Sequence, residues 1–247
     1  MKSKPALALL HGWGMNPRVF DALVPHLADY FELLPLALPG HGGAELLPTN
    51  TLATWAARIS MQLPERTTLL GWSLGGQVAM QIARDDPAQV ERLILLSSTP
   101  KFVLSDDWKA GIPREDLQAF GADLQRDART TLLRFLTLQT RGAGAQKALL
   151  ENLRTRFFAA PIAQVQALSA GLEILLATDL RGDVATLNQP TLVVHGGLDK
   201  LVPASASVWL AQTLLDAHHC VLDSAAHAPL LSHPQQVAEA ILEWTHG

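Results

Sequence analysis

The chain has 247 residues, of which 48% are hydrophobic and 17% charged, and its formal net charge is −4. This composition provides for a large core and excludes a disordered chain, while the mild acidity argues against nucleic acid as the main partner. The single cysteine, Cys220, excludes an internal disulfide and a zinc site built from several cysteines.

The first apolar run, Ala6–Leu10, follows two lysines and ends at His11-Gly12-Trp13-Gly14. A signal peptide needs about 7–15 apolar residues followed by a small-residue cleavage site. A membrane span needs about 20 apolar residues, and no stretch of the chain approaches that length. The run therefore predicts a buried strand, and we expect a cytoplasmic protein that does not associate with membranes.

Short apolar runs alternate with amphipathic segments along most of the chain. The runs predict strands at 6–10, 33–36, 67–71, 93–96, 191–195 and 220–223. The segments predict helices at 19–29, 52–61, 76–84, 205–215 and 234–245. Strands that alternate with helices indicate βαβ units and a parallel sheet, so we expect an α/β fold of about six mainly parallel strands flanked by helices.

The alternation stops between residues 101 and 181, where apolar residues recur only at helical spacing. We expect this stretch to be a helical cap inserted into a core formed by residues 1–100 and 182–247. The cap carries 11 basic and 9 acidic residues, against 8 and 14 in the core. Its basic residues are either a binding face or ordinary solvated helix surface, and the sequence leaves both open.

The sequence Gly71-Trp72-Ser73-Leu74-Gly75 fits the pattern G-x-S-x-G, and it lies between a predicted strand and a predicted helix. A nucleophilic serine occupies a tight strand-to-helix turn in this motif, and only small neighbours permit such a turn. We therefore predict that Ser73 is a catalytic nucleophile.

A serine hydroxyl needs a base, and the base needs an acid to orient it. His227 follows the last predicted strand among small residues, whereas His233 precedes a proline at a helix start and suits a surface or capping role. Asp199 follows the fifth predicted strand. Since the chain order in such enzymes is serine, acid, histidine, we predict Asp199 as the acid and His227 as the base. Caps, turns or surface positions better explain Asp179, Asp183 and Asp223.

Acyl transfer also requires donors for the oxyanion of the tetrahedral intermediate. The loop that contains Trp13 follows the first predicted strand, and Leu74 follows the nucleophile. We predict that the backbone N–H groups of Trp13 and Leu74 form the oxyanion hole. No H-E-x-x-H pair or multi-cysteine pattern is present, so we expect no metal and no cofactor.

Together these motifs resemble the α/β-hydrolase superfamily along nearly the whole chain. More narrowly, the chain resembles the pimeloyl-[acyl-carrier protein] methyl ester esterases of biotin synthesis. The narrower resemblance rests on Trp13, Trp72, the cap stretches 134–140, 171–175 and 179–181, and the segments 225–229 and 232–234.

The resemblance implies a serine carboxylesterase that uses an acyl-enzyme and frees the distal carboxylate of pimeloyl-carrier protein. It implies a substrate site formed by Trp13, Ser73, Leu74, Phe135, Leu136, Thr137, Leu138, Gln139 and His227. It also implies that cap arginines contact an acyl-carrier protein. Arg134 matches such a position, Lys147 stands at another basic position, and Glu151 stands where an arginine is expected. Carrier contacts in this chain would then come from Arg129, Arg134, Arg141, Lys147, Arg154 and Arg156.

Only ten residues precede His11, so we expect the antiparallel strand pair found at the N-terminus of such folds to be missing. We expect a monomer. Two alternatives remain open. The same triad could serve a general short-chain carboxylesterase, or a C–C hydrolase or lyase acting on a small carboxylated metabolite. A binding protein that kept the fold without activity is disfavoured because the predicted triad is complete.

Overall fold

The computed structural model describes residues 4–141 and 144–246. Its centre is a six-stranded sheet in the order β2-β1-β3-β4-β5-β6, in which every neighbouring pair is parallel. The strands are β1 (Ala6–Leu10), β2 (Glu32–Leu36), β3 (Thr67–Trp72), β4 (Val90–Leu96), β5 (Thr191–Gly196) and β6 (Ala217–Leu222). The predicted α/β fold with six parallel strands is confirmed.

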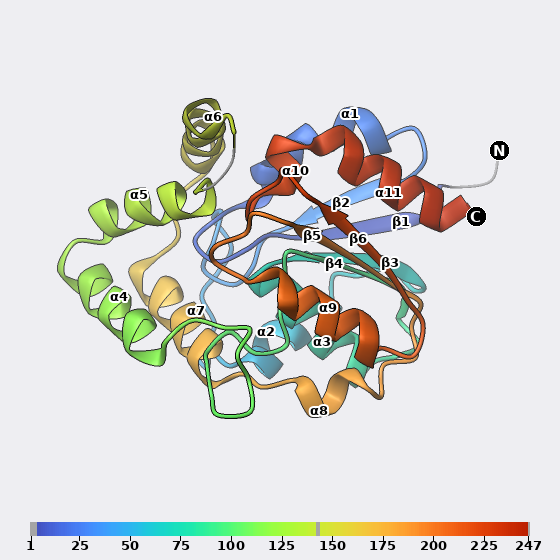
Figure 1. Cartoon of the computed structure of the whole chain (residues 1–247), viewed down its shortest axis with the longest axis horizontal. Coiled ribbons are helices and arrows are strands. Elements are labelled where there is room, and N and C mark those ends of the chain that lie inside the picture. Colours follow the sequence, from blue (N-terminus) through green and yellow to red (C-terminus); the bar gives the residue numbers. More distant parts are fainter. Residues whose placement is uncertain (1–3, 142–143, 247) are drawn as a thin grey trace.

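Helices cover both faces of this sheet (Figure 1). One face carries the 3₁₀ helix η1 (Pro17–Ala22), α1 (Val24–Leu27), α10 (Pro229–Ser232) and α11 (Pro234–His246). The other face carries α2 (Leu52–Ser60), α3 (Leu74–Asp85) and α9 (Ala204–Thr213). β1, β3 and β5 are almost wholly buried, which explains why they read as continuous apolar runs rather than alternating patterns.

The segment between β4 and β5 contains five helices among the described residues. They are α4 (Arg114–Arg126), α5 (Ala128–Gln139), α6 (Gln146–Phe158), α7 (Val165–Ala177) and the short α8 (Arg181–Val184). In Figure 1, α4, α5, α6 and α7 lie together beyond one end of the sheet, while α8 lies beside the core. We refer to α4–α7 as the cap.

The two chain connections between sheet and cap are tied to each other. Lys101 and Asp179 form an isolated antiparallel bridge, and the Lys101 ammonium lies 3.0 Å from the Asp179 carboxylate. Arg181 pairs with the same carboxylate at 2.7 Å and with Asp107 at 3.0 Å. Hydrogen bonds from Arg181 and Lys101 hold the pKa of Asp179 well below its ordinary value. This cluster links the start and end of the cap.

The predicted helix at 19–29 is wrong, because the structure divides it into η1 and α1. Pro25 causes the division: its ring would clash with the carbonyl of Asp21 in a continuous helix, and it has no N–H to donate. β4 and β6 also begin three residues before their predicted starts. The first residues of these two strands include charged or histidine side chains, such as Glu91 and His218. They interrupt the apolar pattern, so a search for apolar runs misses the start of each strand.

The strand order reverses at β1, which has β2 on one side and β3 on the other. The carboxyl ends of β1 and β3 are therefore neighbours at this switch point. In open parallel sheets, ligands bind in the crevice at such a switch point. The loops that follow β1 and β3 carry Trp13 and Ser73. Among the described residues, no helix is long and apolar enough to span a membrane.

Candidate active site

Ser73 occupies the turn between β3 and α3 with φ 57° and ψ −120°. A non-glycine residue rarely adopts a positive φ, and such strain is typical of functional turns. The turn is held by the Ser73 N–H, which donates to the Leu96 carbonyl at 3.0 Å, and by the Ser98 hydroxyl, which donates to the Ser73 carbonyl at 2.8 Å. The strained backbone is therefore fixed from the neighbouring strand.

Glycines beside Ser73 make this turn possible. A Cβ placed on Gly75 would lie 2.3 Å from the Leu10 carbonyl oxygen, and one on Gly76 would lie 2.2 Å from the Ser98 hydroxyl. Both distances are too short for any side chain. The small residues of G-x-S-x-G-G thus let α3 begin directly against the ends of β1 and β4.

Ser73, His227 and Asp199 form one hydrogen-bonded array. The Ser73 hydroxyl lies 3.0 Å from His227 Nε2, and His227 Nδ1 lies 2.8 Å from Asp199 Oδ2. Asp199 Oδ1 accepts hydrogen bonds from the Leu201 and Val202 amides at 2.8 and 2.9 Å. Because a carboxylate accepts hydrogen bonds and cannot donate them, the contact with the Asp199 carboxylate assigns the proton on His227 to Nδ1. Nε2 is then free to accept the hydroxyl proton of Ser73.

The three side chains come from separate elements and are nearly buried, with exposed fractions of 9% for Ser73, 6% for Asp199 and 1% for His227. Trp72 links two of these elements, since its indole N–H donates to the His227 carbonyl at 2.9 Å. The Trp72 ring also lies 5.7 Å from the imidazole. Trp72 therefore fixes the loop that carries His227 next to the strand that carries Ser73. His233 instead bonds to Ser224 and Ser232, away from this array.

The loop after β1 brings a second set of donors to Ser73. A Cβ placed on Gly12 would lie 3.2 Å from the Ser73 Cβ, which shows how closely the loop approaches. Among the described residues, the backbone N–H groups of Trp13 and Leu74 have no hydrogen-bond acceptor. Unpaired amides at this position are chemically suited to an oxyanion.

Two buried histidines brace that loop. His11 accepts a hydrogen bond from the Leu38 amide at 3.1 Å, and His41 accepts one from the Gly14 amide at 3.3 Å. Their rings are tilted against each other with centroids 5.4 Å apart. Burial lowers the pKa of His11 to about 3 and that of His41 to about 4, so both rings are neutral at physiological pH.

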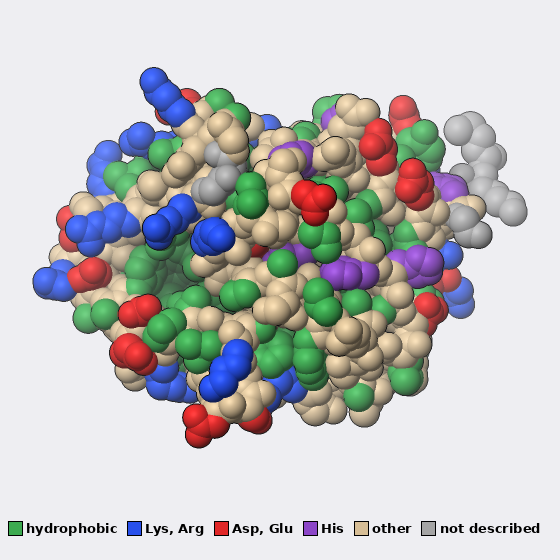
Figure 2. Space-filling view, viewed as in Figure 1, with side chains coloured by type: hydrophobic (Ala, Val, Ile, Leu, Met, Phe, Trp, Pro, Cys, Tyr) green, Lys and Arg blue, Asp and Glu red, His purple; other side chains and the backbone are tan. Residues whose placement is uncertain are grey.

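A cavity of about 230 Å³ opens beside Ser73, between the cap and the sheet. Figure 2 shows this hollow lined by hydrophobic side chains, with Lys and Arg side chains along one edge and acidic side chains along the other. Its lining consists of Trp13, Ser73, Phe102, Ile112, Asp116, Leu117, Phe120, Phe135, Leu138, Leu172, Leu175, Lys200 and Leu201. The cavity is smaller than most ligand pockets and mainly apolar, which suits a slender acyl chain.

Four of the predicted substrate residues, Trp13, Ser73, Phe135 and Leu138, line this cavity. The other three from the α5 stretch lie elsewhere. Leu136 is buried in the core, Thr137 is exposed, and Gln139 is buried with no partner for either amide atom among the described residues. Because a helix turns by about 100° per residue, five consecutive residues of α5 cannot all face one cavity.

Several cavity residues were not predicted from the sequence as site residues. Leu117 and Phe120 come from α4, and Leu172 and Leu175 come from α7. Their helical spacing identifies them as apolar helix faces, but the packing of those helices over Ser73 is a tertiary feature. Trp13 joins the layers: its indole N–H donates to the Leu168 carbonyl of α7 at 2.8 Å, and its ring packs edge-on against Phe135.

The six basic residues predicted to contact a carrier protein lie on α5, α6 and the loop between them. Figure 2 shows Lys and Arg side chains gathered over these helices. Arg134 lies 3.4 Å from Asp123, and the half-buried Arg156 lies 3.5 Å from Asp21. Arg129, Arg141, Lys147 and Arg154 are exposed and form no ion pair among the described residues.

No group of three or more histidine, cysteine, aspartate or glutamate side chains in the described part of the chain could hold a metal ion. At the site, the described residues present one set of chemically useful groups. It comprises a hydroxyl next to a basic imidazole, two unpaired amides and an apolar chamber.

Comparison with known proteins agrees with this geometry. The family model for the alpha/beta hydrolase fold matches residues 5–234. An esterase from Exiguobacterium antarcticum superposes with a TM-score of 0.89 at 20% identity, over 100% of this chain and 94% of that chain. Fold and site thus define the class of the protein as an α/β hydrolase.

Two curated relatives are closer in sequence, and both bear the name pimeloyl-[acyl-carrier protein] methyl ester esterase. The protein from Nitrosospira multiformis is 38% identical over 97% of this chain and 94% of its own length. The protein from Nitrosomonas europaea is 40% identical over 94% of this chain and 92% of its own length. The chain belongs to the pimeloyl-[acyl-carrier protein] methyl ester esterase family, and it is a carboxylic ester hydrolase.

Proposed function

We propose that this enzyme hydrolyses the methyl ester of pimeloyl-[acyl-carrier protein], releasing methanol and the free distal carboxylate. The observation that carries the proposal is the hydrogen-bonded array of Ser73, His227 and Asp199 beside a small apolar cavity. The names of the relatives supply the acyl group, the alcohol and the carrier. This step is the one in biotin synthesis that the sequence resemblance implies.

The reaction proceeds in two halves. His227 Nε2 takes the proton from the Ser73 hydroxyl as the oxygen attacks the ester carbonyl, and the Trp13 and Leu74 amides stabilise the oxyanion. His227 then gives that proton to the departing methoxide, and methanol leaves. A water molecule, deprotonated by His227, attacks the acyl-enzyme, and the proton returns to Ser73 as the carboxylate is released. Asp199 keeps the imidazole in the required tautomer and stabilises its charged form.

The apolar cavity suits the methylene chain of the pimeloyl group. Trp13, Phe135 and Leu138 contribute large hydrophobic surfaces to it, together with α4 and α7. The thioester end of the chain must then leave toward solvent, where the carrier is attached. The exposed basic residues Arg129, Arg141, Lys147 and Arg154 of the cap would face an acidic carrier protein, with Arg134 and Arg156 already partly engaged by carboxylates.

The alternative substrates are small carboxylated metabolites. A buried arginine or lysine beside the serine would be expected for such a substrate. Lys200 is the basic residue among the described lining of the cavity, and it is exposed. We therefore favour an ester whose far end is linked to a carrier.

The test compares kcat/KM for methyl pimeloyl-carrier protein with that for free dimethyl pimelate, with acid release followed by mass spectrometry. We expect a large preference for the carrier-linked ester. Comparable or reversed values would leave a serine esterase of small molecules and remove the carrier protein as a partner. Ser73→Ala measured in parallel excludes a contaminating esterase.

A further inference from the structure

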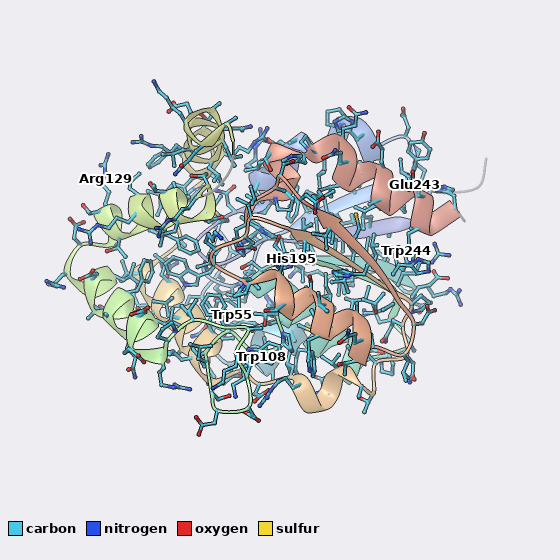
Figure 3. All side chains as sticks on the ribbon, viewed as in Figure 1. Trp55, Trp108, Arg129, His195, Glu243 and Trp244 are labelled. Carbon is cyan, nitrogen blue, oxygen red and sulfur yellow. The ribbon has the colours of Figure 1, made fainter. Side chains whose placement is uncertain are left out.

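His195 is a buried histidine next to the site that the reaction above does not use. It lies in β5, one residue before the strand ends and four residues before Asp199. Its side chain is fully buried, and Figure 3 shows it in the interior of the molecule, near the start of α9. Burying a polar ring without hydrogen bonds costs free energy, so a histidine at this position is expected to have a structural or functional role.

The contacts of His195 assign its protonation. Nε2 lies 2.9 Å from the Val202 carbonyl oxygen, and a carbonyl can only accept, so Nε2 carries the hydrogen. Nδ1 has no partner among the described residues. Burial lowers the pKa of His195, so the ring is neutral with its one N–H on the side of Asp199.

This N–H binds the same stretch of backbone that binds the acid. Val202 donates its own N–H to Asp199 Oδ1 at 2.9 Å and accepts the N–H of His195 on its carbonyl. The same His195 nitrogen lies 3.5 Å from Asp199 Oδ2, the oxygen that accepts the His227 Nδ1–H at 2.8 Å. His195 thus contacts both the backbone that orients Asp199 and the oxygen that faces His227.

We propose that His195 is a positioning residue for ester hydrolysis, which holds the 199–202 loop through its hydrogen bond to the Val202 carbonyl and places that N–H dipole beside the Asp199 oxygen that orients His227. The proposal rests on the proposed function, since it assigns His195 a role in that reaction. The charged or titratable groups facing His195 are Asp199 on its own loop, His227 after β6 and His219 on β6. His219 is itself hydrogen-bonded to Ser207 of α9.

The test uses three variants and dimethyl pimelate, which needs no carrier. His195→Gln can place an amide N–H near the position of Nε2, whereas His195→Leu fills similar space without a donor. We expect the leucine variant to lose about 10- to 100-fold in kcat with little change in KM, since the Val202 carbonyl is left without its buried donor and the N–H beside the Asp199 carboxylate is removed. We expect the glutamine variant to retain most of the turnover.

The pH profile separates positioning from packing. Without the N–H dipole, Asp199 Oδ2 presents more negative charge to His227, so the acid limb of kcat/KM against pH should move upward by about half a pH unit in His195→Leu. It should stay in place in His195→Gln. Equal losses in both variants with an unmoved acid limb, or no loss in either, would overturn the proposal.

A third variant covers a leucine protein that does not fold. His195→Asn keeps an amide but is one methylene shorter, so its N–H falls short of Val202, and it should behave like leucine. Glutamine and asparagine variants of equal activity would overturn the proposal. If the wild-type chain cleaves no ester at all, the proposed function fails first; if it does and the variants do not differ, only the role of His195 fails.

Discussion

Ser73 combines a reactive position with a strained backbone, and the surrounding structure keeps it there. A positive φ on a non-glycine residue costs about 1–3 kcal/mol. The hydrogen bonds from Ser73 to Leu96 and from Ser98 to Ser73 belong to the buried core and hold this conformation. At the scale of single residues, the molecule thus uses stability from its core to present one hydroxyl to His227.

Replacing that hydroxyl should abolish turnover while the fold remains. We expect Ser73→Ala to lower kcat for dimethyl pimelate by about four orders of magnitude or more, because the nucleophile is lost while the Cβ and backbone remain. Circular dichroism should be unchanged. Ser205→Ala, on the exposed side of α9, is the matched control and should keep full activity. Retained turnover in Ser73→Ala would contradict the assignment of the nucleophile.

The buried histidines of the loop after β1 should make stability depend on pH. The pKa of His41 is about 4 in the folded protein because of burial, against about 6.5 when unfolded. Below pH 6.5 the unfolded chain therefore binds a proton that the folded chain does not. Stability from the neutral ring is complete above pH 6.5 and is lost as the pH falls toward 4, by about 1.4 kcal/mol per pH unit. His11 adds a similar loss.

Urea unfolding at pH 7, 5.5 and 4.5 measures this slope. We expect His41→Gln, which has no ring to protonate, to reduce the fall in unfolding free energy by about 1.4 kcal/mol per pH unit between pH 5.5 and 4.5. A slope equal to that of the wild-type protein would mean that His41 takes up its proton in the folded state.

At the scale of elements, the site depends on close approaches between segments that are distant in sequence. Trp13 illustrates this point, since its indole bonds to α7 and packs against α5 while its backbone faces Ser73. Gly171 of α7 permits the contact: a Cβ at this position would lie 2.6 Å from Trp13 Cδ1. The rigid indole is held by Phe120 and Phe135, so it cannot move aside easily.

Gly171→Ala should therefore damage both stability and catalysis. Overpacking costs about 1–3 kcal/mol, and alanine returns only about 1 kcal/mol of helix propensity. We expect a lower melting temperature and a lower kcat/KM for dimethyl pimelate, because Trp13 lines the cavity and its loop carries one of the proposed oxyanion donors.

Gly121→Ala on α4 provides the control. A Cβ there would lie 3.6 Å from Leu172 Cδ1, which is an ordinary contact. The free energy of unfolding of this variant should therefore rise by up to about 1 kcal/mol. If the two variants have the same melting temperature and the same kcat/KM, the close contact of Trp13 with α7 is not required for stability or for activity.

At the scale of the whole molecule, the cap and the sheet play different parts. The sheet and its loops supply Ser73, Asp199, His227 and the two free amides, whereas the cap supplies most of the apolar cavity. The ion pairs of Asp179 with Lys101 and Arg181 fix the two connections between these parts. Exposed basic residues on α5 and α6 then present a positive surface next to the cavity (Figure 2).

Salt should discriminate between carrier-linked and free substrates. Exposed charge pairs are screened by added salt, so raising the ionic strength should increase KM for methyl pimeloyl-carrier protein more than for dimethyl pimelate.

Arg154→Ala should likewise raise KM only for the carrier-linked ester, by about two- to fivefold, as expected for one exposed ion pair.

Arg66→Ala is the charge-matched control, since Arg66 lies in the loop before β3 and pairs with Glu91. It should leave both KM values unchanged. Equal salt sensitivity of the two substrates would reduce the basic cap surface to ordinary solvated side chains.

The sequence by itself determined that the protein has a parallel sheet and that it belongs to the α/β hydrolases. Buried parallel strands must be short continuous apolar runs, and a nucleophile turn admits only small neighbours, so both leave local patterns. Ser73, Asp199 and His227 could also be selected from the sequence, because they follow predicted strands in the chain order serine, acid, histidine. Pro25 was also in the sequence, but the apolar pattern at 19–29 masked the break that it causes in the helix.

Only the tertiary structure decided which cap residues face Ser73 and which groups support the acid. Leu117, Phe120, Leu172 and Leu175 are ordinary apolar helix positions until the packing of α4 and α7 directs them into one cavity. The approach of His195 to Asp199 likewise depends on how the loop after β5 folds back on the strand. Such contacts join side chains through space, and no local spacing in the sequence encodes them.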